Sequence, residues 1–145
     1  MNAASGQGLR LGILEPHLGA YGGIRRMVEF ANRLVDRGHQ VTFYVPATEP
    51  RRCAWMPCRA QVRHLRDGYD DDLDVLLFND EPQWFLLDRF GRARRRVFYA
   101  LHHSGLYQKR SSWEALRAEV DLQLANSAWT ADQIAAEIGH RPEVV

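Results

Sequence analysis

The chain has 145 residues, a formal net charge of +1 and a pI near 7.9. This length allows one domain with a genuine core, and the near-neutral charge excludes the global positive field that is typical of nucleic-acid binders and polybasic membrane proteins. No apolar run reaches the roughly 18 residues of a membrane span, and the polar start MNAASGQG lacks the apolar core of a signal peptide. We therefore expect one cytoplasmic domain, 1–145, with no nucleic-acid partner.

The first third of the chain has the pattern of a strand, a helix and a second strand. A short apolar run at 9–15, bounded by turn residues, predicts a buried parallel strand. After the stretch GAYGG, apolar residues recur at helical spacing, which predicts a helix that ends at Gly38. The run QVTFYVP at 40–46 predicts the second strand, so that the three elements form a βαβ unit.

The middle of the chain continues this alternation after a long loop. Residues 47–58 contain two prolines and no periodicity, which predicts a loop, and a weak strand is expected at 62–65. The apolar run 74–78 predicts a strand, and the sequence at 80–83 is typical of a capped helix start with a capping box. We expect the helix that begins there to continue to about Phe90 and to end at Gly91.

The last third repeats the same order twice. The stretch RRVFYALHHSG predicts a strand whose carboxyl end is His102–His103, and a helix is expected to begin at Ser111. A further strand is predicted at 121–126, followed by a helix that Ser127 or Thr130 caps and Gly139 ends. Alternating strands and helices predict an α/β fold, a doubly wound (Rossmann-like), mostly parallel sheet with helices on both faces, in which ligands bind beyond the carboxyl ends of the strands.

Gly22 and Gly23 lie in the first strand-to-helix turn, at the edge where helix amides and the helix dipole favour a phosphate. A nucleotide-triphosphate loop is excluded, because Lys followed by Ser or Thr is missing at the helix start. A dinucleotide site is disfavoured, since the loop lacks G-x-G-x-x-G and the second strand ends without an acid. A plain turn in which both glycines have positive φ remains an open alternative.

The order of these motifs along the chain resembles that of a known protein family. A strand, the Gly-Gly loop, IRRMVEFANRLVDRGHQVTFYVP, a strand ending in His, and LANSAWTADQIAAEIG together resemble the N-terminal domain of family 4 glycosyltransferases of the two-domain GT-B type. The resemblance implies retaining transfer from a nucleotide sugar without metal or cofactor, in the synthesis of glycans, glycolipids or cell-surface polysaccharides. It also implies that a C-terminal domain with an E-x7-E pattern binds most of the donor. We expect that domain to be absent from this chain. The chain would then be an excised or truncated acceptor-side half, which we favour, or its second half would come from another chain.

The resemblance also implies roles for particular residues. Gly22 and Gly23 would lack side chains so that the donor diphosphate and its sugar come close to the backbone. A histidine at the end of a strand would contact the donor sugar or the acceptor. His102 and His103 are therefore the candidate catalytic residues. Neighbours on a strand face opposite ways, so only one should face the cleft, and we favour His102.

Five further residues are candidates on chemical grounds. Arg25 and Arg26 stand at a helix start and oppose its dipole, so that a bound anion would explain them. Glu15 ends the first strand and is a candidate for an acceptor hydroxyl. Tyr21 is a candidate for stacking on a sugar face. Asp80 also ends a strand, where a helix cap is the simpler interpretation.

Partners are inferred from weaker signals. The basic cluster at 91–96 is interpreted as solvated surface at the amino edge of the sheet, and the alternative is contact with anionic lipids at the inner membrane face. The cleft face, if left uncovered, could also form a dimer. The competing function is that of a stand-alone Rossmann-like module that binds a phosphorylated ligand.

Overall fold

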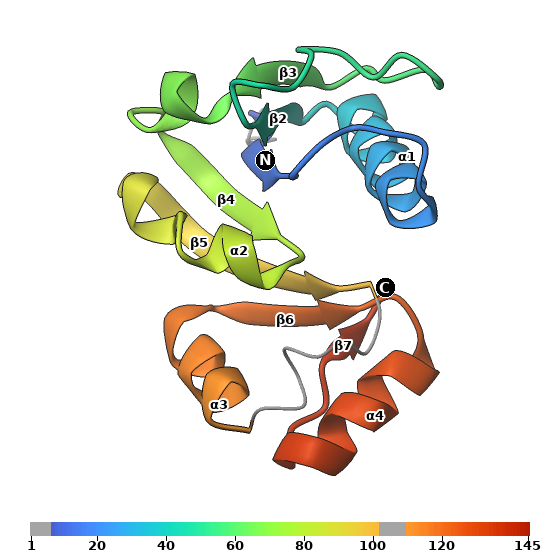
Figure 1. Cartoon of the computed structure of the whole chain (residues 1–145), viewed down its shortest axis with the longest axis vertical. Helices are drawn as coiled ribbons and strands as arrows, with labels where there is room; N and C mark the ends of the chain where they lie inside the picture. Colours follow the sequence, from blue (N-terminus) through green and yellow to red (C-terminus); the bar gives the residue numbers. More distant parts are fainter. Residues whose placement is uncertain (1–6, 102–109) are drawn as a thin grey trace, which may run out of the picture.

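The computed structural model describes residues 7–101 and 110–145, and their strands form one sheet (Figure 1). The sheet has seven strands in the order β3-β2-β1-β4-β5-β6-β7, and each of its six pairings is parallel. The strands are β1 (Arg10–Leu14), β2 (Gln40–Val45), β3 (Gln61–His64), β4 (Leu73–Phe78), β5 (Ala93–Ala100), β6 (Leu122–Ala125) and β7 (Glu143–Val144). The expected doubly wound α/β fold is confirmed.

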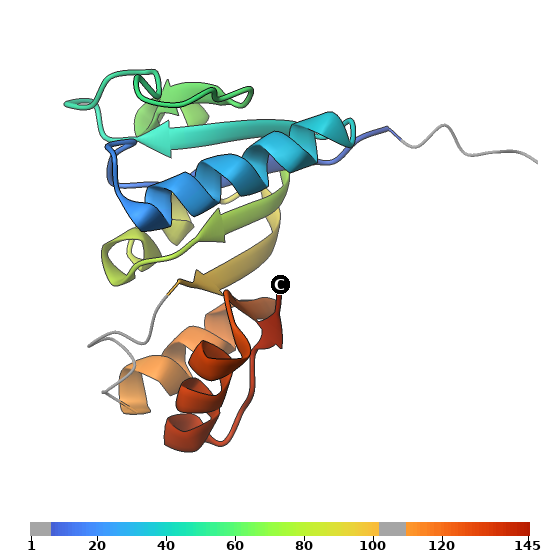
Figure 2. The same ribbon diagram turned by 90° about the vertical axis from the view of Figure 1, so that its right-hand side faces the viewer.

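Helices cover both faces of the sheet. They are α1 (Gly22–Asp36), α2 (Glu81–Trp84), α3 (Arg110–Glu119) and α4 (Ala128–Ile138), with short 3₁₀ turns η1 (Leu65–Gly68) and η2 (Leu87–Arg89). The core is divided by the sheet into two clusters, one under α1 and the other under α3, α4 and η2. Figure 2 shows α1 running beside the strands of the upper half of the molecule, with α4 at the opposite end.

The period of two along β1 explains how one strand serves both clusters. Ile13 packs with Met27 and Val28 of α1, whereas Leu14 packs in the other cluster with Phe78, and all five side chains are buried. Successive side chains of a strand point to opposite faces, so an unbroken apolar run is what a strand buried on both sides requires. The apolar run at 9–15 therefore predicts both the strand and the burial of its two faces.

Helix ends follow the local signals in the sequence. Gly38 (φ 87°) and Gly139 (φ 69°) are left-handed, as expected for residues that terminate α1 and α4. Ser127 is the N-cap of α4, and its Oγ accepts a hydrogen bond from the Thr130 backbone N–H at 3.1 Å. Three predicted helix boundaries are thus confirmed.

Two sequence expectations about element bounds are wrong. The single helix expected up to Phe90 is split into α2 and η2, because backbone bonds from Leu86, Arg89 and Phe90 reach back only three residues. This tighter winding places Leu87 and Phe90, three positions apart, on one side, where both are buried. The strand expected to reach His102–His103 ends at Ala100, so alternation along the strand gives no basis for preferring one histidine.

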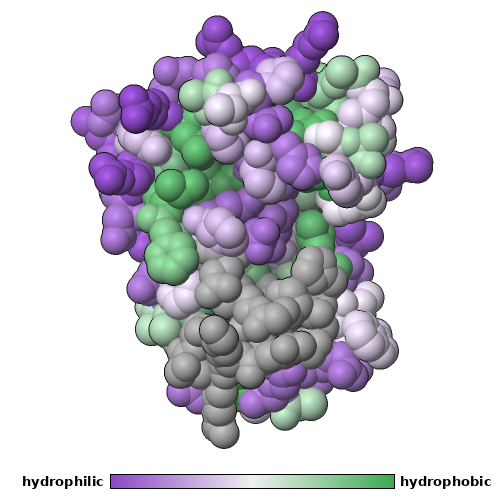
Figure 3. All heavy atoms as spheres, in the orientation of Figure 1, coloured by the Kyte–Doolittle hydropathy of each residue, from purple (hydrophilic) through white to green (hydrophobic). Residues whose placement is uncertain are grey.

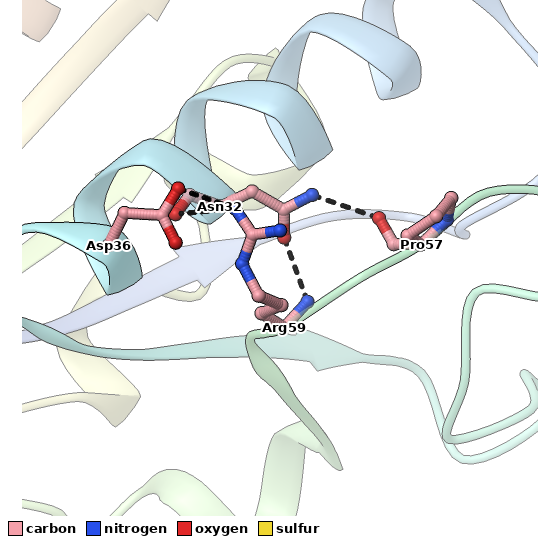
Figure 4. A network of polar contacts seen from close by, with 4 residues as sticks. All are labelled: Asn32, Asp36, Pro57 and Arg59. Carbon is pink, nitrogen blue, oxygen red and sulfur yellow. Dashed lines mark hydrogen bonds and ion pairs between the residues drawn. The ribbon is translucent and has the colours of Figure 1, made fainter.

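The long loop between β2 and β3 is fastened to α1 (Figure 4). The side-chain amide of Asn32 donates to the Pro57 carbonyl (2.9 Å) and accepts from the Arg59 backbone N–H (2.8 Å). Arg59 also pairs with Asp36 at 2.6 Å. Earlier in the same loop, Trp55 donates from Nε1 to the Leu18 carbonyl at 2.9 Å. The loop therefore supports both α1 and the segment that connects β1 to α1.

The basic cluster at the start of β5 is neutralised by carboxylates. Arg92, Arg94, Arg95 and Arg96 lie within 4.0 Å of Asp72, Asp74, Asp121 and Asp88, respectively. The arrangement agrees with a solvated, charge-balanced surface, since exposed pairs of this kind contribute little stability. Figure 3 shows polar side chains over much of one face, with apolar atoms gathered in patches between them. No helix in the described residues is long and apolar enough to cross a membrane.

Candidate functional site

A pocket lies where the strand order reverses, between β1 and β4. In doubly wound sheets the connections leave for opposite faces at this point, and ligands bind in the resulting crevice. The pocket has a volume of about 300 Å³. It is lined by residues from the β1–α1 connection, the first turn of α1 and the ends of β4 and β5: Glu15, Pro16, His17, Tyr21, Gly23, Ile24, Asn79 and Leu101. The pocket thus lies beyond the carboxyl ends of the strands, where the sequence analysis expects a ligand site.

Glu15 follows the last residue of β1, and its side chain is only 3% exposed. The backbone N–H of Glu15 donates to the Tyr44 carbonyl, which fixes the residue to the end of β2. Its Oε1 accepts a hydrogen bond from Asn79 Nδ2 at 2.6 Å. Burial raises the pKa of Glu15 to about 8; Asn79 opposes this rise and the nearby charge of Asp80 adds to it. Glu15 is therefore mostly a neutral acid at neutral pH.

Gly22 and Gly23 are the first two residues of α1, and neither has positive φ. The alternative of a plain left-handed turn is therefore wrong. Among the described residues, a Cβ at Gly22 would meet nothing within 4 Å, whereas one at Gly23 would lie 3.2 Å from Leu101 Cδ1. Glycine costs a helix roughly 0.5–1 kcal/mol relative to alanine, so nothing in the described structure requires a glycine at position 22.

The start of α1 has no side-chain cap. Tyr21 is the N-cap residue and makes no capping bond, and no acidic residue lies in the first turn. The first backbone N–H groups of a helix have no partner within the helix and carry its positive dipole end. The Tyr21 side chain is 67% exposed, and its ring centroid lies 4.9 Å from that of His17. Tyr21 and His17 thus form an aromatic rim beside the uncapped helix start.

Arg25 and Arg26 have partners within the chain, contrary to the expectation that only a bound anion would explain them. Arg25 pairs with Glu29 one turn later, at 3.0 Å. Arg26 donates from Nε to the Tyr99 hydroxyl (2.8 Å) and from Nη2 to the Val145 carbonyl (2.9 Å). Arg26 thereby ties α1 to β5 and to the end of β7, and neither arginine lines the pocket.

The other predicted site residues are placed as follows. Asp80 is exposed and directly precedes α2, the position expected of a helix cap; its backbone N–H donates to Gln83 Oε1 at 3.1 Å, as in a capping box. His102 and His103 lie outside the described residues, although Leu101 just before them lines the pocket. The sequence analysis missed Asn79 and His17. Asn79 could have been found as the first residue after β4, the strand next to β1.

Three further hollows in the described residues lie elsewhere. Two of them are lined by residues at the amino ends of β1 and β2, including Arg10 and Gln40, and a third lies beside the amino ends of β6 and β7. These positions are at the edge of the sheet opposite to the crevice where ligands of doubly wound folds bind. The pocket around Glu15 is therefore the candidate functional site.

Comparison with known proteins shows the kind of fold to which the chain is similar. No family model matches the sequence, and no curated protein matches it either. Among solved structures, the chain is similar to an alpha-glucosyltransferase in complex with UDP and a 13-mer DNA containing a HMU base, with a TM-score of 0.59 and 21% identity. The likeness covers 94% of this chain and 41% of that protein, so this chain spans less than half its length. The chain thus shares the Rossmann-like α/β fold of the matching part of that structure.

Proposed function

We propose that this chain is the N-terminal, acceptor-side domain of a retaining glycosyltransferase that moves a sugar from a nucleotide sugar to an acceptor. A second domain would bind the nucleotide, and the uncapped start of α1 would approach the donor diphosphate. No metal or cofactor is required in this scheme. The fold likeness to a UDP-bound glucosyltransferase supports the proposal, as does the position of the pocket at the reversal of strand order.

The observation that carries the proposal is Gly22. Its backbone is helical without positive φ, and a Cβ there would meet no atom of the described residues within 4 Å. Alanine would therefore stabilise α1, so the glycine is explained by close approach of a group from outside the chain. Because the neighbouring amides point outward at the positive end of α1, a phosphate oxygen is the natural group.

The test replaces this glycine in the protein at its natural length. Gly22→Ala should raise the free energy of unfolding by about 0.5–1 kcal/mol and lower sugar transfer at least about tenfold, because the methyl group takes the place of the phosphate. Transfer is measured as release of nucleoside diphosphate from a panel of UDP- and GDP-sugars. Gly91→Ala is the matched control: Gly91 is exposed, lacks positive φ, and its Cβ would make only an ordinary contact of 3.9 Å.

Three outcomes are informative. Loss of transfer in a stabilised Gly22→Ala protein, with normal transfer in Gly91→Ala, supports the proposal. Transfer by Gly22→Ala within about threefold of the wild type would contradict the role of Gly22. Tight binding of nucleoside diphosphates by residues 1–145 without transfer at any length would replace the proposal with a phosphate-binding module.

A further inference from the structure

The lining of the pocket is chemically selective. Most of it is apolar, and its polar side chains are an acid and an amide, Glu15 and Asn79, together with His17 and Tyr21 on the rim. Among the described lining residues there is no arginine or lysine. Asp80, next to Asn79, contributes negative charge near Glu15. Among the described residues, the lining therefore has no arginine or lysine with which proteins usually neutralise an anion.

Glu15 and Asn79 form an acid–amide pair with unused hydrogen-bonding capacity. Asn79 Nδ2 is bound to one oxygen of Glu15 at 2.6 Å. Within the described part of the chain, neither the second carboxyl oxygen of Glu15 nor the side-chain carbonyl of Asn79 has another hydrogen-bond partner. With burial keeping Glu15 protonated, the pair offers one O–H donor and one carbonyl acceptor to the pocket.

We propose that this pocket takes one uncharged sugar ring, and that Glu15 and Asn79 are its specificity-determining residues, holding a hydroxyl group between the acid and the amide. A hydroxyl is both donor and acceptor, so it satisfies both groups at once. A phosphate or carboxylate oxygen only accepts, so at this pair it would face the Asn79 carbonyl, whereas the donor phosphate of the proposed function would be met by the backbone amides at the start of α1. The inference rests on the proposed function for its biological setting and names the substrate class of the pocket.

The aromatic rim suits the same occupant. The Tyr21 ring is exposed and packs at an angle of 56° against the His17 ring. An exposed aromatic ring beside an apolar pocket provides a flat surface for the C–H face of a sugar, while the few polar groups fix its orientation. A volume of about 300 Å³ lies at the small end of the range for small-molecule sites, which is enough for one sugar ring.

The experiment is a titration of the 145-residue chain followed by NMR. The neutral probes are the methyl glycosides of glucose, galactose and mannose, and the anionic probes are glucuronate and glucose 6-phosphate. The reporter is the side-chain amide resonance of Asn79. We expect at least one neutral probe to shift it, with an affinity at least about tenfold higher than that of either anionic probe at about pH 7. Glu15→Ala should weaken this binding about tenfold, and Glu15→Gln should recover most of the loss.

The pH dependence of sugar affinity tests whether Glu15 contacts the sugar directly. If Glu15 had only a structural role, its ionisation would not change this affinity. Ionised Glu15 and the Asn79 carbonyl are both acceptors, and one hydroxyl hydrogen satisfies only one of them. Wild-type affinity should therefore fall at least about threefold as the pH rises above about 8, whereas the affinity of Glu15→Gln should stay level. Glu15→Gln retains the other titratable neighbours, Asp80, His17 and Tyr21, so the difference isolates Glu15.

The outcomes separate this inference from the proposed function. Equal or tighter binding of the anionic probes, or no shift of the Asn79 amide with any neutral probe, would overturn the inference even if the natural-length protein transfers sugar. Neutral-probe binding with the stated dependence on Glu15 would support the pocket as a sugar site. That result would stand even if sugar transfer were never observed, in which case only the proposed enzyme function would fail.

Discussion

Replacing Glu15 with Gln should change how the stability of the protein depends on pH. Gln has the shape of the protonated acid, and its Oε1 can still accept from Asn79 Nδ2, but it does not ionise. The folded state raises the pKa of Glu15 from 4.5 to about 8, mainly through burial. The folded protein therefore holds this proton more tightly than the unfolded chain, and the stability associated with it is lost as the pH rises.

The magnitude follows from the two pKa values. Each tenfold difference in proton affinity corresponds to about 1.4 kcal/mol, so the gap between 4.5 and about 8 amounts to roughly 5 kcal/mol in full. The contribution is complete below about pH 4.5 and is gone above about pH 8. Between about pH 5 and about pH 8, wild-type stability should fall by roughly 3 kcal/mol more than that of Glu15→Gln.

The assay is urea unfolding of wild type and variant at several values of pH across this window. Taking the difference between the two proteins removes the contributions of the other titrating groups. Glu143→Gln is the control, because Glu143 is exposed in β7, and its curve should run parallel to that of the wild type. If the Glu15→Gln curve is also parallel to the wild type within about 0.5 kcal/mol, Glu15 is ionised or solvated, and the reasoning is refuted.

Three other predictions concern packing and polar anchors, and urea unfolding measures each of them. Gly68→Ala should destabilise the protein by about 1–3 kcal/mol, because its Cβ would come within 2.1 Å of the buried Tyr44 ring; no loss would mean that the ring moves freely. Asn32→Ala should cost about 1–3 kcal/mol, since it leaves two backbone groups without partners. Arg26→Met should cost more than Arg25→Met, because Arg26 bridges distant strands and Arg25 pairs only on the helix surface; equal effects would contradict the structural role of Arg26.

Much of the fold could be predicted from local patterns in the sequence. The apolar runs located the strands, since a strand buried on both faces must be apolar at every position. The spacing of Ile24, Met27 and Val28 located α1, and Ser127 and Gly139 marked the ends of α4. These signals act within a few residues, through the helical period, capping bonds and the conformational freedom of glycine. The same patterns predicted one helix where the structure has α2 and η2. There the burial of Leu87 and Phe90 on one side favours the tighter 3₁₀ winding over the α-helix.

The candidate site was decided by tertiary structure. The sequence by itself named Glu15, Tyr21, Gly22 and Gly23, because they follow the first strand. It did not determine that Glu15 is buried, and therefore neutral, since burial depends on which distant segments surround it; Asn79, its hydrogen-bond partner, lies 64 positions away and is brought close only by the pairing of β1 with β4. The sequence alone made Arg26 a candidate for binding an anion, whereas the fold gives it the Tyr99 hydroxyl as a partner 73 positions away. Burial and charge pairing depend on which distant segments meet, and that is fixed by the order of strands in the sheet.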